Sequence, residues 1–533
     1  MTAVALPARH ALRGSWSMSR ALVAWIGQWL RRHAVSLTIL LPLLGFVAAV
    51  QITGARSWPS YVDDSGVYLA QAWAVAYQGG LSPYTYFYDH APGGWIQIGM
   101  WAALTGGFNR YRSAMEFGAE VMLLAKLAAG AMLYAFGRRL GFSRPGAALA
   151  VVLFGLCPLA IALGRPAFLD NIMIAWLLAA FVLAYAPSRS IGAASGATLC
   201  FAMAVLSKET ALVLLPAFAW ALGSNLDRRN RQQVLTVSIF CGVLALAMWP
   251  LFALYKGELF PRSGQTSLLG TAAWQLAGRP SSGWLWEGGS GVRALLDQWL
   301  AVDPYLLVAG VVAVPVAFAV PRLRPAALAL VISWLMLARG GHVPAMYVVV
   351  LLPFSALMVA GVLEALSGNR RIADGSPLRV RTRWIGRVVR GWYTLLLGVI
   401  LLIGTALVWN GPIRAATTAG EPQPLRQATD WIGSHVPRDK VLVVHDAIWT
   451  DLVHRYGFSP HPIMADKLDH DPQVRETLTR IDYLVVPESY YRTSDPAAYP
   501  TLLRARDHAV EVAAFGTGSR AVHVYRVSWY WRP

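Results

Sequence analysis

Two stretches in the first quarter of the sequence combine residue types that can move protons and bind anions. The first reads Ser60-Tyr-Val-Asp-Asp-Ser-Gly-Val-Tyr68 and contains the adjacent carboxylates Asp63 and Asp64. Neighbouring side chains point in different directions unless the backbone turns sharply, so one carboxylate can act as a base while the other orients it or holds a cation. The pair predicts acid–base chemistry, although most paired carboxylates in loops are simply solvated.

The second stretch reads Tyr84-Thr-Tyr-Phe-Tyr-Asp-His-Ala-Pro-Gly-Gly-Trp95, with Tyr88, Asp89 and His90 at its centre. Aromatic rings beside a carboxylate suit the apolar faces and hydroxyls of a sugar, and they also favour a membrane interface. Both interpretations stay open from the residues alone.

Three shorter connections also carry charged or titratable side chains. Their members are Arg165 and Asp170 in Gly164-Arg-Pro-Ala-Phe-Leu-Asp170, Lys208 and Glu209 in Ser207-Lys-Glu209, and Arg339 and His342 in Arg339-Gly-Gly-His342. Any one of them can be a charge that reaches water from a membrane boundary. Together they predict a site that holds an anionic head group on a lipid tail.

The elements that must position these residues are apolar helices. Of the 533 residues, 56% are hydrophobic and 14% are charged, against about 25% charged in soluble domains. The runs 36–53, 234–255, 343–363 and 391–410 contain no Asp, Glu, Lys or Arg, and runs of this length cross a ~30 Å hydrocarbon core as helices. Composition therefore excludes a soluble enzyme, a disulfide-rich secreted module and a disordered protein. It indicates an α-helical polytopic membrane protein.

The transmembrane region is predicted to cover 36–410 with about eleven spans. The expected spans are 36–53, 116–137, 146–163, 168–186, 192–206, 210–223, 234–255, 304–320, 325–338, 343–364 and 391–410. The apolar segment 92–108 contains five glycines, and we expect it to form a juxtamembrane or re-entrant element.

Charge gives the orientation. If 92–108 does not cross, the connections on the side of the N-terminal segment 1–35 hold 21 Lys or Arg in 88 residues, whereas the opposite loops hold 10 in 121. The positive-inside rule then places 1–35 in the cytoplasm, and the long loops 54–115 and 256–303 outside. The net charge of +18 is explained in the same way, so we expect no nucleic-acid partner.

The segment 411–533 has a different character and predicts a small extracytoplasmic α/β domain. It contains an amphipathic helix pattern at 425–436 and short apolar strand patterns at 441–444 and 481–486. Its histidines lack the regular spacing of a zinc site, and we expect them to be surface residues: His435, His445, His454, His461 and His470.

The motifs Val62-Asp-Asp-Ser-Gly-Val-Tyr68 and Tyr88-Asp-His-Ala-Pro-Gly-Gly-Trp95 resemble the first extracytoplasmic loop of the C-type membrane glycosyltransferases. The similarity is greatest to the family 39 branch, which holds the protein O-mannosyltransferases and the lipid A aminoarabinose transferase. It covers roughly 36–365 and includes the Arg165-to-Asp170 signature. The chain departs from the pattern in having Asp-Asp where many relatives have Asp-Glu. It also has Ala-Pro where Pro-Pro is common, and His90 where the aminoarabinose branch has Lys.

The resemblance implies an enzyme that transfers a sugar from a polyprenyl phosphate in the plasma (cell inner) membrane to an extracytoplasmic protein, lipid or envelope glycan. Asp63 would be the general base, and Asp64 would assist it, directly or through a divalent cation such as Mg or Mn. His90, Arg165 and Lys208 would contact the donor phosphate. The remaining motif residues would bind substrate or be structural: Tyr88, Asp89, Asp170, Glu209, Arg339 and His342. The alternatives are a lipid-linked-sugar transporter or flippase, and a non-catalytic membrane assembly protein.

Overall fold

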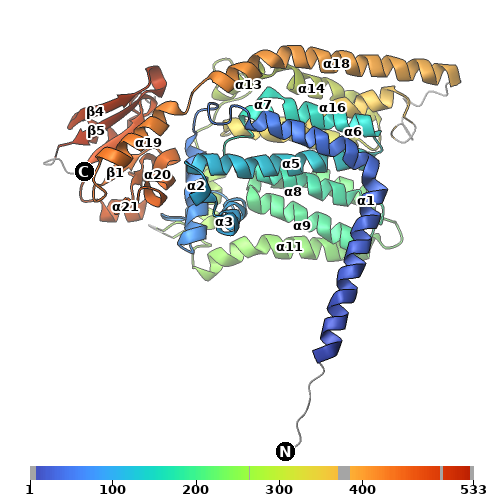
Figure 1. The fold of residues 1–533 in the computed structure, drawn as a ribbon, viewed down its shortest axis with the longest axis horizontal. Coiled ribbons are helices and arrows are strands. Elements are labelled where there is room, and N and C mark those ends of the chain that lie inside the picture. The colour runs from blue at the N-terminus through green and yellow to red at the C-terminus, as the bar shows by residue number, and fades with distance from the viewer. Residues whose placement is uncertain (1–7, 263–264, 370–371, 373–383, 493–495, 529–533) are drawn as a thin grey trace, which may run out of the picture.

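The computed structural model describes residues 8–528 apart from 263–264, 370–371, 373–383 and 493–495. It consists of a bundle of helices with a small α/β domain at one end (Figure 1). This arrangement agrees with the predicted fold class of a helical membrane protein that carries a C-terminal α/β domain.

Each predicted apolar run lies on helical elements of the bundle, and three runs are divided between two elements: 146–163, 210–223 and 343–364. The main helices are α1 (Ala8–Ile52), α5 (Ala114–Leu140), α6 (Arg144–Leu156), α8 (Leu169–Ala184), α9 (Ile191–Ser207), α10 (Leu215–Asn225), α11 (Arg231–Tyr255), α14 (Pro304–Ala319), α15 (Arg324–Ala338), α16 (Leu351–Leu366) and α18 (Trp384–Thr418). Shorter elements complete this part of the chain: α7 (Pro158–Ala162), η1 (Glu209–Leu214), α12 (Leu268–Ala273), α13 (Gly291–Val302) and η3 (Ala345–Val350).

By length and composition, five of the described helices can cross a membrane. They are Gly27–Ile52, Ala114–Leu140, Arg231–Tyr255, Ala345–Leu366 and Leu396–Ala415. A sixth is added if α13 and α14, which meet at a bend of 107°, count as one span, and four further apolar helices are shorter. The count of eleven crossings therefore stays a prediction.

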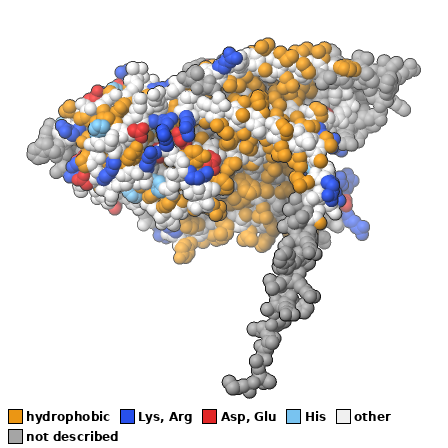
Figure 2. Space-filling model, in the orientation of Figure 1, with side chains coloured by type: hydrophobic (Ala, Val, Ile, Leu, Met, Phe, Trp, Pro, Cys, Tyr) orange, Lys and Arg blue, Asp and Glu red, His pale blue; other side chains and the backbone are white. Residues whose placement is uncertain are grey.

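The outer surface of the bundle is apolar. On α11 alone, Val237, Phe240, Val243 and Met248 are exposed, and Figure 2 shows hydrophobic side chains covering the bundle while charged ones gather over the α/β domain. A continuous apolar surface of this kind marks contact with a membrane or a partner rather than with water.

The first outer loop forms a layer across the end of the bundle. It contains α2 (Asp63–Tyr77), α3 (Gly93–Thr105) and α4 (Gly107–Arg110), and α2 and α3 run across the direction of the bundle helices (Figure 1). Helix α3 is not among the candidate spans of the described chain. Several helices that lie in predicted spans are also too short to be candidate spans, so the non-crossing of 92–108 stays a prediction.

The C-terminal domain is a mixed five-stranded sheet with helices. The strand order is β2-β1-β3-β5-β4, with β1 parallel to β2 and β3, and with β5 antiparallel to β3 and β4. The strands are β1 (Leu442–Val444), β2 (Ile463–Met464), β3 (Tyr483–Pro487), β4 (Ala509–Phe515) and β5 (Val522–Val527). The helices are α19 (Gln423–His435), α20 (Asp446–His454), α21 (Pro472–Thr477), α22 (Glu488–Tyr491) and α23 (Pro500–Asp507). The predicted helix at 425–436 and the strands at 441–444 and 481–486 are confirmed.

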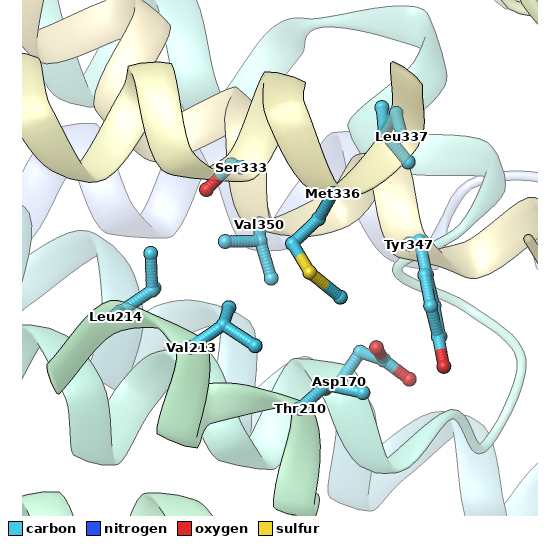
Figure 3. A pocket seen from close by; sticks show the side chains of 9 residues that line it. All are labelled: Asp170, Thr210, Val213, Leu214, Ser333, Met336, Leu337, Tyr347 and Val350. Atoms are coloured by element: carbon cyan, nitrogen blue, oxygen red, sulfur yellow. The ribbon is translucent and has the colours of Figure 1, made fainter. Parts of the chain in front are cut away.

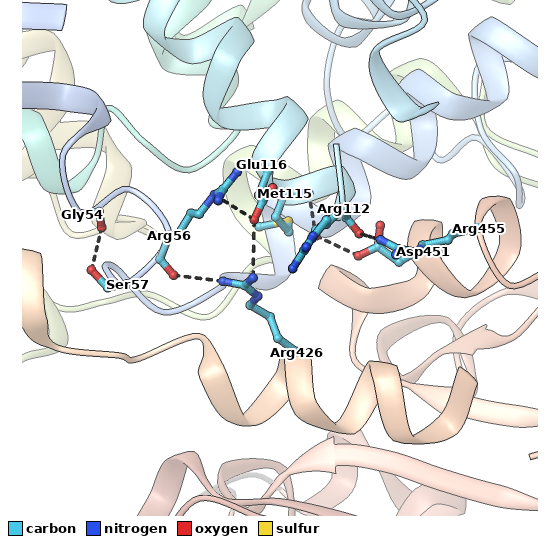
Figure 4. Close-up of polar contacts among 10 residues, drawn as sticks. Gly54, Arg56, Ser57, Arg112, Met115, Glu116, Arg426, Asp451 and Arg455 are labelled. Carbon is cyan, nitrogen blue, oxygen red and sulfur yellow. Dashed lines mark hydrogen bonds and ion pairs between the residues drawn. The ribbon is translucent and has the colours of Figure 1, made fainter. Parts of the chain in front are cut away.

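The domain and the first outer loop share one hydrophobic core, in which Trp73 and Trp95 belong to the same cluster as Trp449 and Ile432. Polar contacts reinforce this packing. Arg426 of α19 lies 3.6 Å from Glu116, and Asp451 of α20 accepts hydrogen bonds from the backbone N–H of Ala114 (2.6 Å) and from Ser113 Oγ (2.8 Å) (Figure 4). An acceptor at the first turn of α5 satisfies a backbone donor that would otherwise lack a partner.

Candidate functional site

Helix α2 separates the two acidic side chains of the first motif. It begins at Asp63, with Val62 in an extended conformation at the N-cap, and carboxylates in a first turn interact favourably with the helix dipole. Successive side chains on a helix point about 100° apart, so Asp63 and Asp64 face different surroundings, as the sequence predicts. We call these surroundings the domain side, where Asp63 meets the C-terminal domain, and the bundle side, where the charge of Asp64 acts on Lys208.

On the bundle side, Lys208 is the centre of a buried polar cluster. Its side chain is 2% exposed, and Nζ lies 3.4 Å from the Tyr68 hydroxyl and 3.0 Å from His90 Nε2. The other ring nitrogen of His90 lies 2.9 Å from Glu209 Oε1. An ammonium can only donate, so Nε2 of His90 accepts and the ring carries its proton on Nδ1, towards Glu209.

The charges in this cluster hold one another in place. Burial raises the pKa of Glu209, but His90 and Lys208 outweigh it and lower that pKa to about 2. Burial and Lys208 lower the pKa of His90, yet Glu209 and Asp89 give it a net rise. The pKa of Lys208 is also raised, because Asp170, Glu209 and Asp64 outweigh burial. The cluster therefore retains a fixed cation at neutral pH.

Asp64 and Asp170 complete the bundle side. The charge of Asp64 acts on Lys208, Tyr68 and His342. Asp170 is 1% exposed, and neither of its carboxylate oxygens has a side-chain or backbone hydrogen-bond partner among the residues that the structure describes. Its carboxylate lines a cavity together with Tyr347, Thr210 and apolar side chains of the bundle (Figure 3).

On the domain side, Asp63 meets a histidine of the C-terminal domain. Its Oδ1 lies 2.6 Å from Nε2 of His445, which is 4% exposed. Burial raises the pKa of Asp63, but His445 and the Tyr490 hydroxyl outweigh it and hold that pKa below its ordinary value. The Asp63 side chain is 48% exposed, so an acceptor hydroxyl can reach it. The prediction that His445 is a surface residue is wrong, because it is buried where the C-terminal domain packs against α2.

The second motif is bent into place at Tyr88. This residue has a left-handed backbone (φ 58°), which is uncommon outside glycine and reverses the chain direction locally. The Tyr88 side chain is buried, and its hydroxyl donates to Glu258 Oε2 over 2.6 Å. Beyond the bend, the His90 side chain joins the polar cluster around Lys208. The charge of Asp89 also acts on Lys467 of the C-terminal domain.

Arg165 lies elsewhere. Its guanidinium donates to backbone carbonyls at and beyond the end of α1, including Gln51 O (3.1 Å), Thr53 O (2.6 Å) and Trp58 O (3.0 Å). A phosphate role for Arg165 stays a prediction, and the structure shows it capping the end of a helix.

Arg339 and His342 lie in the connection between α15 and η3. Burial and the charge of Arg279 lower the pKa of His342, and Asp64 partly opposes this. The charge of Arg339 acts on His342 and on Tyr347. Both residues therefore border the bundle side, in agreement with their predicted clustering.

A divalent cation at Asp64 stays a prediction. Among the described residues, no group of three or more His, Cys, Asp or Glu side chains is arranged to hold a metal ion. Mg²⁺ is usually held by one or two carboxylates together with substrate phosphates.

Sequence reasoning missed the contributions of the C-terminal domain to this site. Two of these contributions act on Asp63 directly: His445 lies against it, and Tyr490 lowers its pKa. Two others interact through charge, Asp446 with Asp63 and Lys467 with Asp89. No local motif marks these residues. Their one signal in the sequence is the charge pattern, which predicts that the C-terminal domain lies on the same side of the membrane as the first loop.

The sequence profile of the family described as "Dolichyl-phosphate-mannose-protein mannosyltransferase" matches residues 93–252. The matched segment begins at α3 and contains Arg165, Asp170, Lys208 and Glu209. No curated protein matches the sequence.

Solved structures extend the similarity over the whole chain. ArnT from Cupriavidus metallidurans bound to undecaprenyl phosphate superposes with a TM-score of 0.56 at 14% identity, over 93% of this chain and 99% of ArnT. AglB from Archaeoglobus fulgidus, an archaeal oligosaccharyltransferase in complex with an inhibitory peptide and a dolichol-phosphate, gives a TM-score of 0.52 at 14% identity, over 94% of this chain and 75% of AglB.

The fold is that of the C-type membrane glycosyltransferases. The resemblance seen in the sequence motifs is thereby confirmed. The similarity to ArnT covers almost the full length of both chains, so it extends into the C-terminal domain.

Proposed function

We propose that this chain is an integral-membrane glycosyltransferase that moves a sugar from a polyprenyl-phosphate donor to an extracytoplasmic protein, lipid or envelope glycan, with inversion. One observation carries the proposal. The two motifs of the first outer loop converge with Lys208 at one end of an apolar bundle. A lipid tail can lie along such a bundle while its phosphate reaches the cation.

The roles follow from the two sides of α2. Asp63 takes the proton of the acceptor hydroxyl as its oxygen attacks the anomeric carbon. The bond from that carbon to the phosphate oxygen breaks, and polyprenyl phosphate leaves from the opposite face, which inverts the anomeric centre. Lys208 stabilises the departing phosphate, since a fixed cation aimed at developing charge is the strongest electrostatic contribution to such steps. His90 holds Lys208 in place by accepting a hydrogen bond from its Nζ. Asp64 orients Lys208.

Two further observations support the donor and the orientation. Of the similar structures, ArnT is bound to undecaprenyl phosphate, and AglB is in complex with a dolichol-phosphate. The excess of Lys and Arg in the loops on the N-terminal side supports a cytoplasmic N-terminus and an extracytoplasmic C-terminal domain in the plasma membrane.

The test is donor turnover by the purified full-length protein in detergent. A panel of polyprenyl-phosphate sugars is supplied with a crude envelope acceptor, and free polyprenyl phosphate is followed by mass spectrometry. Asp63→Asn is compared with wild type. The matched control is Asp297→Asn, because the Asp297 side chain is 59% exposed and pairs with Arg293 on its own helix.

We expect wild type and Asp297→Asn to release polyprenyl phosphate with one sugar of the panel. Asp63→Asn is expected to lose about 10²- to 10⁴-fold in kcat, the usual contribution of a general base. Equal release by Asp63→Asn would remove Asp63 as the base. No release by folded wild type that binds donor would favour the flippase or the assembly protein.

A further inference from the structure

We propose that the C-terminal α/β domain is part of the catalytic site, and that His445 is a positioning residue for the carboxylate of Asp63. The inference rests on the proposed function and deepens it. It assigns a role to a domain that no sequence motif connects with the reaction.

The hydrogen bonds of His445 fix both its orientation and its tautomer. The backbone N–H of Ala447 donates to His445 Nδ1 over 3.1 Å, so His445 is the N-cap of α20. A ring nitrogen that accepts carries no proton, and in the neutral imidazole the proton is then on the other nitrogen. Nε2–H therefore donates to Asp63 Oδ1 over 2.6 Å. The backbone N–H of His445 donates to Val485 O over 2.9 Å.

The approach of the domain to α2 is close. A Cβ atom added to Gly66 would lie 2.3 Å from the backbone carbon of Asp446 and 2.4 Å from the nitrogen of Ala447. Only glycine permits this contact, which brings the first turn of α20 onto α2. About two helical turns further along α2, Trp73 packs edge-on against Trp449. The Nε1 of Trp73 donates to His454 Nδ1 over 3.1 Å.

The same domain also holds the second motif of the loop. Asp471 accepts from the backbone N–H of Thr85 (3.1 Å) and from its hydroxyl (3.2 Å), and the Tyr84 hydroxyl donates to Pro462 O over 2.8 Å. Lys467 lies over the ring of Phe87, with 5.1 Å between Nζ and the ring centroid. Both chemistry-bearing stretches of the first loop are thus fixed by contacts to the C-terminal domain.

A histidine that only capped α20 would not need to place its second nitrogen against a catalytic carboxylate. The two roles of His445 use different ring atoms, so substitution can separate them. An asparagine places its Oδ1 near the position of Nδ1 and retains the cap, because Asn is among the best N-cap residues. A glutamine places its Nε2 near the position of the histidine Nε2 and retains a donor to Asp63.

The experiment measures kcat, KM and melting temperature for full-length wild type, His445→Asn and His445→Gln in detergent, with release of polyprenyl phosphate as the readout. The matched controls are His435→Asn and His435→Gln, because His435 is exposed on the same domain. We expect His445→Asn to keep its melting temperature but to lose about 100-fold in kcat with KM within about twofold, the usual cost of a misplaced catalytic group. His445→Gln should keep kcat within about tenfold of wild type and melt at a lower temperature.

The opposite order, in which His445→Asn is active and His445→Gln is not, would overturn the positioning role in favour of a purely structural cap. Wild-type kcat in both variants would overturn it too. A folded wild type with no turnover would overturn the proposed function, and the inference with it. The failure of the inference alone is distinguishable, because wild type then still turns over donor.

Discussion

The two sides of α2 place adjacent carboxylates in contrasting surroundings. On the bundle side, Asp64 faces Lys208, which is fully buried among Tyr68, His90 and Glu209. On the domain side, Asp63 is half-exposed and meets a neutral donor, His445. A buried cation suits a bound phosphate, and an accessible carboxylate oriented by a neutral donor suits a proton acceptor. The difference separates leaving-group stabilisation from base catalysis on one helix.

After Asp63→Asn, the largest effect is expected on the bundle side. Lys208→Met removes the fixed cation but keeps a long apolar side chain, and we expect kcat for donor turnover to fall about 10²- to 10³-fold, as when an electrostatic donor is removed. Release of polyprenyl phosphate measures it, and Lys440→Met, a surface lysine of the C-terminal domain, is the control. Turnover within threefold of wild type in a folded Lys208→Met protein would contradict the division of roles.

A smaller effect is expected at Gly66, where the C-terminal domain packs against α2. Gly66→Ala would force Asp446 away from α2, and overpacking of this kind costs about 1–3 kcal/mol. We expect kcat to fall about tenfold and the melting temperature to drop, because His445 moves with the first turn of α20. Gly288→Ala is the control, since a Cβ atom there would meet nothing within 4 Å. Unchanged turnover in Gly66→Ala would show that the domain can shift without disturbing Asp63.

The smallest effect on turnover is expected at Asp451, which joins the C-terminal domain to the start of α5. Burial raises the pKa of Asp451 to about 6, and its hydrogen bonds to Ala114 and Ser113 only partly oppose this. Because the pKa of Asp451 is raised in the folded state, its contribution to the free energy of unfolding is present in full below about pH 4. That contribution is lost as the pH rises through about 6. The loss is at most roughly 3 kcal/mol, at 1.36 kcal/mol for each pKa unit.

Asp451→Asn is neutral and keeps an acceptor for Ala114, so this part of the pH dependence should disappear. The measurement is the melting temperature of wild type and variant from pH 4 to 7.5. The variant should be the more stable protein above pH 6. A constant difference between the two at every pH would contradict the assignment.

The sequence by itself determined the framework of this protein. All eleven apolar runs lie on helical elements of the bundle, three of them divided between two elements, and 92–108 contains α3. The motifs around Asp63 and His90 were visible as residue types at short spacing. These features could be predicted because hydropathy, charge bias and local spacing are properties of contiguous segments.

Only the tertiary structure decided which neighbour each functional side chain has. It paired Asp63 with His445, brought Lys208 to His90, and directed the guanidinium of Arg165 to the end of α1. Each of these contacts joins segments that are far apart in the chain. Their geometry depends on how α2 and α20 pack around Gly66, and no local pattern of residues encodes that packing.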